Sequence, residues 1–376
     1  MRILTVFGTR PEAIKLAPVV HAFQAEPGIE HATCVTGQHR QMLDQVLDVF
    51  KITPEYDLSL MTPDQTLSQV TSRALGGIET VIKSFAPDWV IVQGDTTTAF
   101  AGALAAFYQK VRVAHVEAGL RTGNRHSPWP EEMNRRLVGQ LTDFHFPPTE
   151  IAASNLAGEG VPASAMLVTG NTVIDALNWV THRLRTEPEL AKGIDQRFSF
   201  IDPSKRMILV TGHRRENLDG GLERVCRGLL EIARRGDVQV VYPVHLNPNV
   251  QTTAQTILGN TPGVHLIPPV DYLPFVRLMQ LSYFIVTDSG GIQEEAPGLG
   301  KPALVTRDTT ERPEAIEAGT ARLVGTDGAT LVAAATQLLD DASCYERHSK
   351  ARNPFGDGRA ASRIVTSLMQ YQVSQR

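Results

Sequence analysis

The chain has 376 residues, more than a single hydrophobic core usually serves, which predicts two domains. Its formal net charge is −4, and this excludes the basic excess of a non-specific nucleic-acid binder. No apolar run reaches the roughly 18 residues of a membrane span, and three widely separated cysteines are typical of a reducing compartment, so we expect a cytoplasmic protein without membrane contact.

Short apolar runs alternate with longer helical patterns along the first half of the chain. Such alternation predicts a parallel sheet covered by helices on both faces. The expected strands are residues 3–7, 32–36, 89–93, 111–115, 144–146 and 166–168, and the expected helices are residues 13–26, 41–50, 66–85 and 97–108.

The same alternation begins again after residues 186–205, where Pro188, Gly193 and Pro203 interrupt a weakly periodic stretch. We therefore expect a second domain of the same kind and an α/β fold with two Rossmann-like doubly wound domains facing a cleft. The expected strands are residues 207–211, 238–243, 264–267, 283–287 and 303–305, and the expected helices are residues 222–234, 275–281 and 331–339.

Carboxylates follow two neighbouring expected strands. Asp95 comes after residues 89–93 and either caps the next helix or acts in chemistry, and Glu117 follows the next strand along the chain. Glu131 and Glu132 follow a proline-rich turn, where one of the two would serve as favourable charge in a first helical turn. Several acids at one rim suit proton transfer, because mutual repulsion and burial bring a carboxylate pKa toward neutrality.

Basic groups also follow expected strands. His213 lies after residues 207–211 beside two arginines, which favours contact with a charged substrate over a purely structural role. Arg10 and Lys15 flank the first strand–helix junction, where a solvated helix start and a substrate contact are equally good interpretations.

Residues 287–295 (TDSGGIQEE) form the clearest ligand loop, since a strand ends, two glycines follow and a helix begins. Free N–H groups at such a helix start suit a diphosphate, and Arg312 could add a charged contact. An ordinary tight turn explains the two glycines but not the surrounding polar residues. Dinucleotide, P-loop and zinc motifs are absent from the sequence.

The sequence resembles the non-hydrolysing UDP-N-acetylglucosamine 2-epimerases. Matching segments occur in order from the first strand to near the C-terminus, which is more specific than any single motif. They are residues 7–13 (FGTRPEA), 37–40 (GQHR), 94–98 (GDTTT), 115–123 (HVEAGLRTG), 128–132 (PWPEE), 170–173 (GNTV), 213–217 (HRREN), 243–248 (PVHLNP), 289–297 (SGGIQEEAP), 310–314 (TERPE) and 353–358 (NPFGDG).

The resemblance implies a GT-B architecture with domains at residues 1–172 and 173–359, a final helix at 360–376 that packs on the first domain, and a homodimer. It implies reversible epimerisation at carbon 2 between UDP-N-acetylglucosamine (UDP-GlcNAc) and UDP-N-acetylmannosamine (UDP-ManNAc), for bacterial surface polysaccharide precursors, without a cofactor or metal. The route is elimination of UDP to 2-acetamidoglucal and re-addition. The implied catalytic residues are Asp95, Glu117, Glu131 and His213.

The resemblance also implies a UDP site. Its implied residues are Arg10, Lys15, Val270, Phe275, Ser289, Gly290, Gly291, Glu295 and Arg312, with Glu295 on the ribose and the uracil against residues 270–275.

Some relatives are activated by a second UDP-GlcNAc. The corresponding residues here are Gln38, His39, Gln41 and His245, together with residues near Glu131, although Gln38 and His39 could instead cap the following helix. Asp64 departs from the basic residue of activated relatives and would repel a phosphate. A GT-B glycosyltransferase, a hydrolysing epimerase and a non-catalytic UDP-sugar sensor are the alternative functions.

Overall fold

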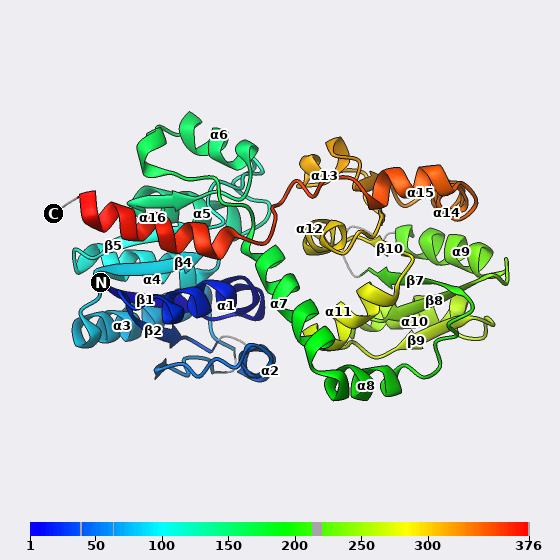
Figure 1. Ribbon diagram of the computed structural model, residues 1–376, viewed down its shortest axis with the longest axis horizontal. Helices are drawn as coiled ribbons and strands as arrows, with labels where there is room; N and C mark the ends of the chain where they lie inside the picture. The colour runs from blue at the N-terminus through cyan, green and yellow to red at the C-terminus, as the bar shows by residue number, and fades with distance from the viewer. Residues whose placement is uncertain (38–39, 63, 213–219, 375–376) are drawn as a thin grey trace. The chain divides into compact units, whose positions relative to one another are not determined.

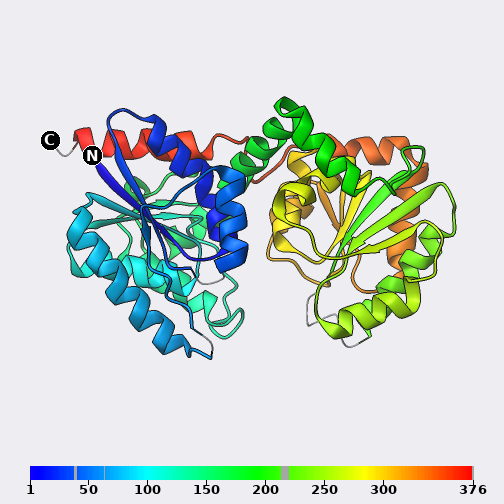
Figure 2. The same cartoon turned by 90° about the horizontal axis from the view of Figure 1, so that it is seen from below.

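The computed structural model describes residues 1–37, 40–62, 64–212 and 220–374. The chain forms two compact units, one of Met1–Ala176 with Phe355–Arg376 and one of Leu177–Pro354 (Figure 1). Within each unit, helices cover both faces of a sheet, as Figure 2 also shows from another direction. In the described residues, no helix is both long enough and apolar enough to cross a membrane.

The first unit is built on a six-stranded sheet in the order β3-β2-β1-β4-β5-β6. Every neighbouring pair is parallel. Because β1 lies between β2 and β4, the strand order reverses at β1 and β4, which is the switch point of a doubly wound sheet. The strands are β1 (Arg2–Phe7), β2 (Glu30–Val35), β3 (Tyr56–Asp57), β4 (Trp89–Gln93), β5 (Arg112–Val116) and β6 (Phe144–Phe146).

Helices of the first unit bury an apolar cluster against this sheet, with α3 and α4 on one face contributing residues such as Ile78 and Ala103. On the other side α16 packs against α1, and the Tyr371 ring meets Trp89 edge-on at 5.3 Å. The helices are α1 (Arg10–Ala25), α2 (Arg40–Phe50), α3 (Leu67–Phe85), α4 (Thr97–Tyr108), α5 (Glu131–Leu141), α6 (Glu150–Gly158), the 3₁₀ turn η1 (Ala163–Ala165), α7 (Thr172–Thr186, which continues into the second unit) and α16 (Ala360–Ser374).

The second unit repeats the topology in the order β12-β11-β10-β7-β8-β9, again with parallel neighbours. Its switch point therefore lies at β7 and β10. The strands are β7 (Arg206–Thr211), β8 (Val238–Pro243), β9 (Val264–Ile267), β10 (Phe284–Thr287), β11 (Ala303–Val305) and β12 (Ala321–Leu323).

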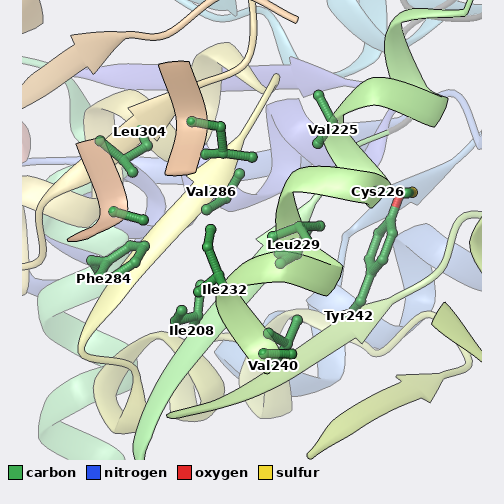
Figure 3. Packing of buried hydrophobic residues seen from close by; sticks show 14 of the residues in the cluster. Ile208, Val225, Cys226, Leu229, Ile232, Val240, Tyr242, Phe284, Val286 and Leu304 are labelled. Carbon is green, nitrogen blue, oxygen red and sulfur yellow. The ribbon is translucent and has the colours of Figure 1, made fainter. Parts of the chain in front are cut away.

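The core of the second unit lies between this sheet and α9, where Ile208, Val240 and Phe284 meet Leu229 and Ile232 (Figure 3). Burial of such side chains supplies the main driving force for the unit. The helices are α8 (Pro188–Arg197), α9 (Gly221–Ala233), α10 (Pro248–Leu258), α11 (Tyr272–Leu281), α12 (Gly290–Gly298), α13 (Pro313–Glu317), α14 (Gly328–Asp340) and α15 (Ala342–Ser349).

The fold class of two Rossmann-like α/β sheets is confirmed, but some expected elements are wrong. Residues 166–168 are not a strand, because only Met166 forms an isolated bridge, to His145. Two short edge strands, β3 and β12, were not expected. The weakly periodic stretch 186–205 contains α8, which was not among the expected helices.

Candidate active site

Glu12 links the turn after β1 to the turn after β4 by hydrogen bonds at the switch point of the first sheet. This buried carboxylate accepts the N–H groups of Gly8 (3.0 Å) and Thr9 (2.8 Å) at Oε2 and the Thr96 hydroxyl (2.6 Å) at Oε1. Burial raises its pKa. Glu12 was not among the expected site residues, although the Thr-x-x-Glu spacing of a capping box was a signal for it.

Asp95 lies between Gly94 and Thr96 at the carboxyl end of β4. Thr96 is the cap of α4, because its hydroxyl accepts the Ala99 N–H at 3.0 Å. The capping interpretation of Asp95 is therefore wrong. Its carboxylate, 27% exposed, forms an ion pair with Arg135 on α5. Asp95 thus presents a partly exposed, charge-compensated carboxylate at the switch point.

Glu117 follows β5, the neighbour of β4, with Gln93 and Val116 as register partners. Its φ of +60° lies in the left-handed region, which residues other than glycine rarely adopt. The carboxylate is 7% exposed and lies 2.7 and 2.5 Å from Lys15 Nζ. Lys15, expected to contact substrate, is therefore engaged by a candidate catalytic acid.

Glu131 and Glu132 begin α5 but differ in surroundings. Glu132 is fully buried and accepts the Thr122 N–H at 3.0 Å and the Arg136 Nε–H at 3.1 Å. Within the described part of the chain, the half-buried Glu131 carboxylate has neither a hydrogen bond nor an ion pair. Glu132 is therefore the structural member of the pair, and Glu131 is the one left available for chemistry.

Three histidines of the first unit, of which His115 and His145 are buried and His31 is half-buried, are held neutral. Burial lowers the pKa of His115 to about 3 and that of His31 and His145 to about 4. His115 Nε2 lies 2.7 Å from the Gly94 carbonyl, which can only accept, so Nε2 carries the proton.

These three histidines predict acid sensitivity. Their folded pKa values lie below the unfolded value of about 6.5, so their contribution to stability is complete above that pH and is lost as the pH falls toward 4. We expect the free energy of unfolding to fall by about 1 kcal/mol per pH unit per histidine. Urea unfolding between pH 7 and 5 measures the slope. His115→Gln should reduce it, and an unchanged slope would contradict the assignment.

In the second unit, the turn from β10 into α12 brings polar groups to the switch point. Ser289 caps α12, and its N–H donates to Thr287 Oγ1 at 3.0 Å. A Cβ added to Gly290 would lie 3.9 Å from the Arg312 guanidinium, and one on Gly291 would lie 3.9 Å from a Glu295 carboxylate oxygen. Five of the expected UDP-site residues thus gather around the start of α12, namely Ser289, Gly290, Gly291, Glu295 and Arg312.

Arg312 and Glu295 are both held by partners. Arg312 Nε forms an ion pair with Glu294, which is buried, and Glu295 Oε1 accepts the Tyr272 hydroxyl at 2.8 Å. Tyr272, on α11, was not an expected site residue. The expected uracil residues are both half-buried: Val270 lies just before α11, and Phe275 lies on it.

The other expected residues are Arg10, Gln38, His39, Gln41, His213 and His245. His213, Gln38 and His39 lie outside the described residues. Arg10 is the first residue of α1 and Gln41 the second of α2. His245 is exposed after β8 and accepts the Asn247 N–H at 3.1 Å, so its local hydrogen bond belongs to the start of α10.

Two doubly wound sheets, each with a polar cluster at its switch point, define an α/β enzyme of the GT-B-like class. A family model described as UDP-N-acetylglucosamine 2-epimerase matches residues 21–369. The UDP-N-acetylglucosamine 2-epimerase of Yersinia pestis is 56% identical over the full length of both chains. This chain belongs to the UDP-N-acetylglucosamine 2-epimerase family and is an isomerase, which confirms the resemblance seen in the sequence.

Solved structures agree with this family. The Neisseria meningitidis UDP-GlcNAc 2-epimerase bound to UDP-GlcNAc is 50% identical with a TM-score of 0.91, covering 98% of this chain and 100% of the other. The Methanocaldococcus jannaschii enzyme in complex with UDP-GlcNAc and UDP is 34% identical with a TM-score of 0.81, covering 98% and 100%.

Proposed function

We propose that this protein interconverts UDP-GlcNAc and UDP-ManNAc by inverting carbon 2. The observation that carries the proposal is the pair of carboxylates, Asp95 and Glu117, at the ends of adjacent parallel strands, with Glu131 at the start of α5. UDP-GlcNAc and UDP are ligands of solved relatives, which supports the same ligands here.

The proposed reaction is an elimination followed by re-addition. A carboxylate takes the carbon-2 proton, the bond from carbon 1 to the diphosphate oxygen breaks with its electron pair leaving on UDP, and 2-acetamidoglucal forms. UDP then adds back to carbon 1 while a second acid delivers a proton to the opposite face of carbon 2. Asp95, Glu117 and Glu131 are the proposed proton-transfer groups. His213, outside the described residues, is proposed to assist UDP departure.

The second unit is proposed to hold UDP throughout. The start of α12 offers backbone N–H groups and a positive dipole end to the diphosphate, beside the Arg312 guanidinium. Glu295 is proposed to bind the ribose hydroxyls and residues 270–275 to lie against the uracil, with Val270 and Phe275 in contact. Arg10 and Lys15 are also proposed substrate contacts. Lys15 pairs with Glu117, a proposed proton-transfer group, which supports its proposed place at the substrate.

NMR of UDP-GlcNAc incubated with the protein in D2O tests the proposal. Reversible appearance of UDP-ManNAc with deuterium at carbon 2 is the expected result. Release of free N-acetylmannosamine would instead indicate a hydrolysing epimerase, and acceptor-dependent transfer would indicate a glycosyltransferase. Binding without any turnover would indicate a UDP-sugar sensor. Each of these three outcomes overturns the proposal.

The setting of the activity is also proposed. We propose a cytoplasmic homodimer that needs no cofactor or metal and supplies UDP-ManNAc for bacterial surface polysaccharide precursors. Sedimentation of the purified protein across a range of concentrations tests the dimer, because a mass of one chain throughout would contradict it.

Substrate activation gives a kinetic prediction. If a second UDP-GlcNAc binds at a site formed with Gln38, His39, Gln41 and His245, UDP-ManNAc alone should be converted slowly, and trace UDP-GlcNAc should accelerate it, because coupling between two sites is reciprocal. Exposed Asp64 opposes such a site by its charge. A progress curve from UDP-ManNAc measures the lag. Full-rate turnover from the first moment would contradict activation.

A further inference from the structure

Helix α5 is joined to the loop after β4 through two consecutive side chains. Asn134 Nδ2 donates to the backbone carbonyl of Asp95 at 2.9 Å, and Arg135 Nη2 pairs with the Asp95 carboxylate. One helix therefore holds both the backbone and the side chain of a proposed proton-transfer residue. The orientation of Asp95 depends on α5 as well as on its own loop.

Arg135 also reaches a second carboxylate. Its Nη1 lies 3.5 Å from Oε2 of the fully buried Glu132, whose other contacts fasten α5 to the Thr122 backbone. The Arg135 side chain is only 12% exposed. A guanidinium so shielded, with donors directed at two acids, forms stronger and more directional bonds than a surface pair.

We propose that Arg135 is the positioning residue for Asp95 in the epimerisation. It acts through Asp95, fixing the direction of the carboxylate and supplying the positive charge that offsets the negative charges of Asp95 and Glu132. This inference rests on the proposed function, because the role of Asp95 belongs to it. Glu131 lies four residues before Arg135 and shares its face of α5, so the same helix carries one proposed acid and orients another.

Arg136 offers a matched control. It is the next residue on the same helix, its side chain is 41% exposed, and its ion pair is with Glu132. Loss of Arg136 therefore removes a cation from Glu132 while leaving the Arg135–Asp95 pair intact. Comparing the two positions separates an effect on Asp95 from an effect on the anchoring of α5.

The test uses the wild-type enzyme and the variants Arg135→Met, Arg135→Lys and Arg136→Met, with turnover followed by NMR and UDP affinity by calorimetry. Arg135→Met should lower kcat roughly 10- to 100-fold, as expected for a displaced catalytic group. UDP affinity should change less than about twofold, because the proposed role of Arg135 is to orient Asp95, a proton-transfer group, rather than to bind UDP. Arg135→Lys should recover only part of the loss, because an ammonium keeps the positive charge but not the fork of directed donors. Arg136→Met should stay within about threefold of wild type.

A double-mutant cycle separates a positioning role from a general structural role, because only a positioning role makes the kcat loss of Arg135→Met depend on Asp95. In an Asp95→Asn background, Arg135→Met should lower the residual kcat by less than about threefold, since the group through which it acts is already disabled. Additive losses, an Arg136→Met loss as large as that of Arg135→Met, or near-normal turnover in Arg135→Met would each overturn the inference. Failure of the wild-type enzyme to epimerise would instead overturn the proposed function.

Discussion

Asp95→Asn, Glu117→Gln and Glu131→Gln are each expected to lower kcat by about 10²-fold or more while UDP still binds. Each substitution keeps the shape of the side chain and removes its ability to exchange a proton. Steady-state kinetics followed by NMR measure kcat, and calorimetry measures the affinity for UDP. Near-normal turnover in any one variant would remove that residue from the proton-transfer set.

The three substitutions differ in their structural side effects. Glu117→Gln removes a carboxylate that pairs with the Lys15 ammonium, and Asp95→Asn removes one that pairs with Arg135. Glu131→Gln breaks neither an ion pair nor a hydrogen bond in the described part of the chain, so its kinetic effect is the most direct measure of lost chemistry. Thermal unfolding of all three variants separates lost chemistry from lost structure.

A matched control is Glu150→Gln. Glu150 is an exposed acid in the first turn of α6, in the same unit, and it lies outside the expected site. Turnover of this variant should remain close to that of the wild type, because an exposed first-turn acid contributes only to helix stability.

Arg312→Ala is expected to weaken UDP binding about 10- to 100-fold, in keeping with the loss of a charge-assisted contact to a diphosphate. The guanidinium lies beside Gly290 at the start of α12, where backbone N–H groups and the helix dipole favour an anion. Calorimetric titration with UDP measures the change directly. An unchanged affinity in a folded Arg312→Ala protein would show that the phosphate role is wrong.

The ion pair with Glu294 complicates this variant. Truncating Arg312 removes the guanidinium that pairs with the buried Glu294 carboxylate, which should lower stability as well as affinity. Glu294→Gln is therefore a necessary companion, because it removes the pair but keeps the guanidinium, and it should retain most of the UDP affinity. Arg322→Ala removes an exposed arginine from β12 of the same unit and should leave UDP binding unchanged.

Most of the strands could be predicted because strands and helices have different hydrophobic periods, whereas the helices α6, α7, α8, α10, α13 and α15 were not among the expected elements. Strands β4, β6, β8, β9 and β11 have the expected bounds. Strands β3 and β12 could not be predicted, since two or three edge residues with exposed positions leave no periodic pattern. Residues 166–168 were misread because a short apolar run, here with an exposed Leu167, does not by itself specify a ladder of backbone hydrogen bonds.

By itself, the sequence determined the doubly wound class, the family, and the residues that follow each strand, because alternation, motifs and strand ends are local properties of the chain. Only the tertiary structure decided which side chains neutralise one another. Lys15 meets Glu117 across 102 positions and Asp95 meets Arg135 across 40. An ion pair forms where the fold brings two charges within a few ångströms. Because neighbouring parallel strands are joined by long crossover helices, residues that lie close together in space can be far apart along the chain.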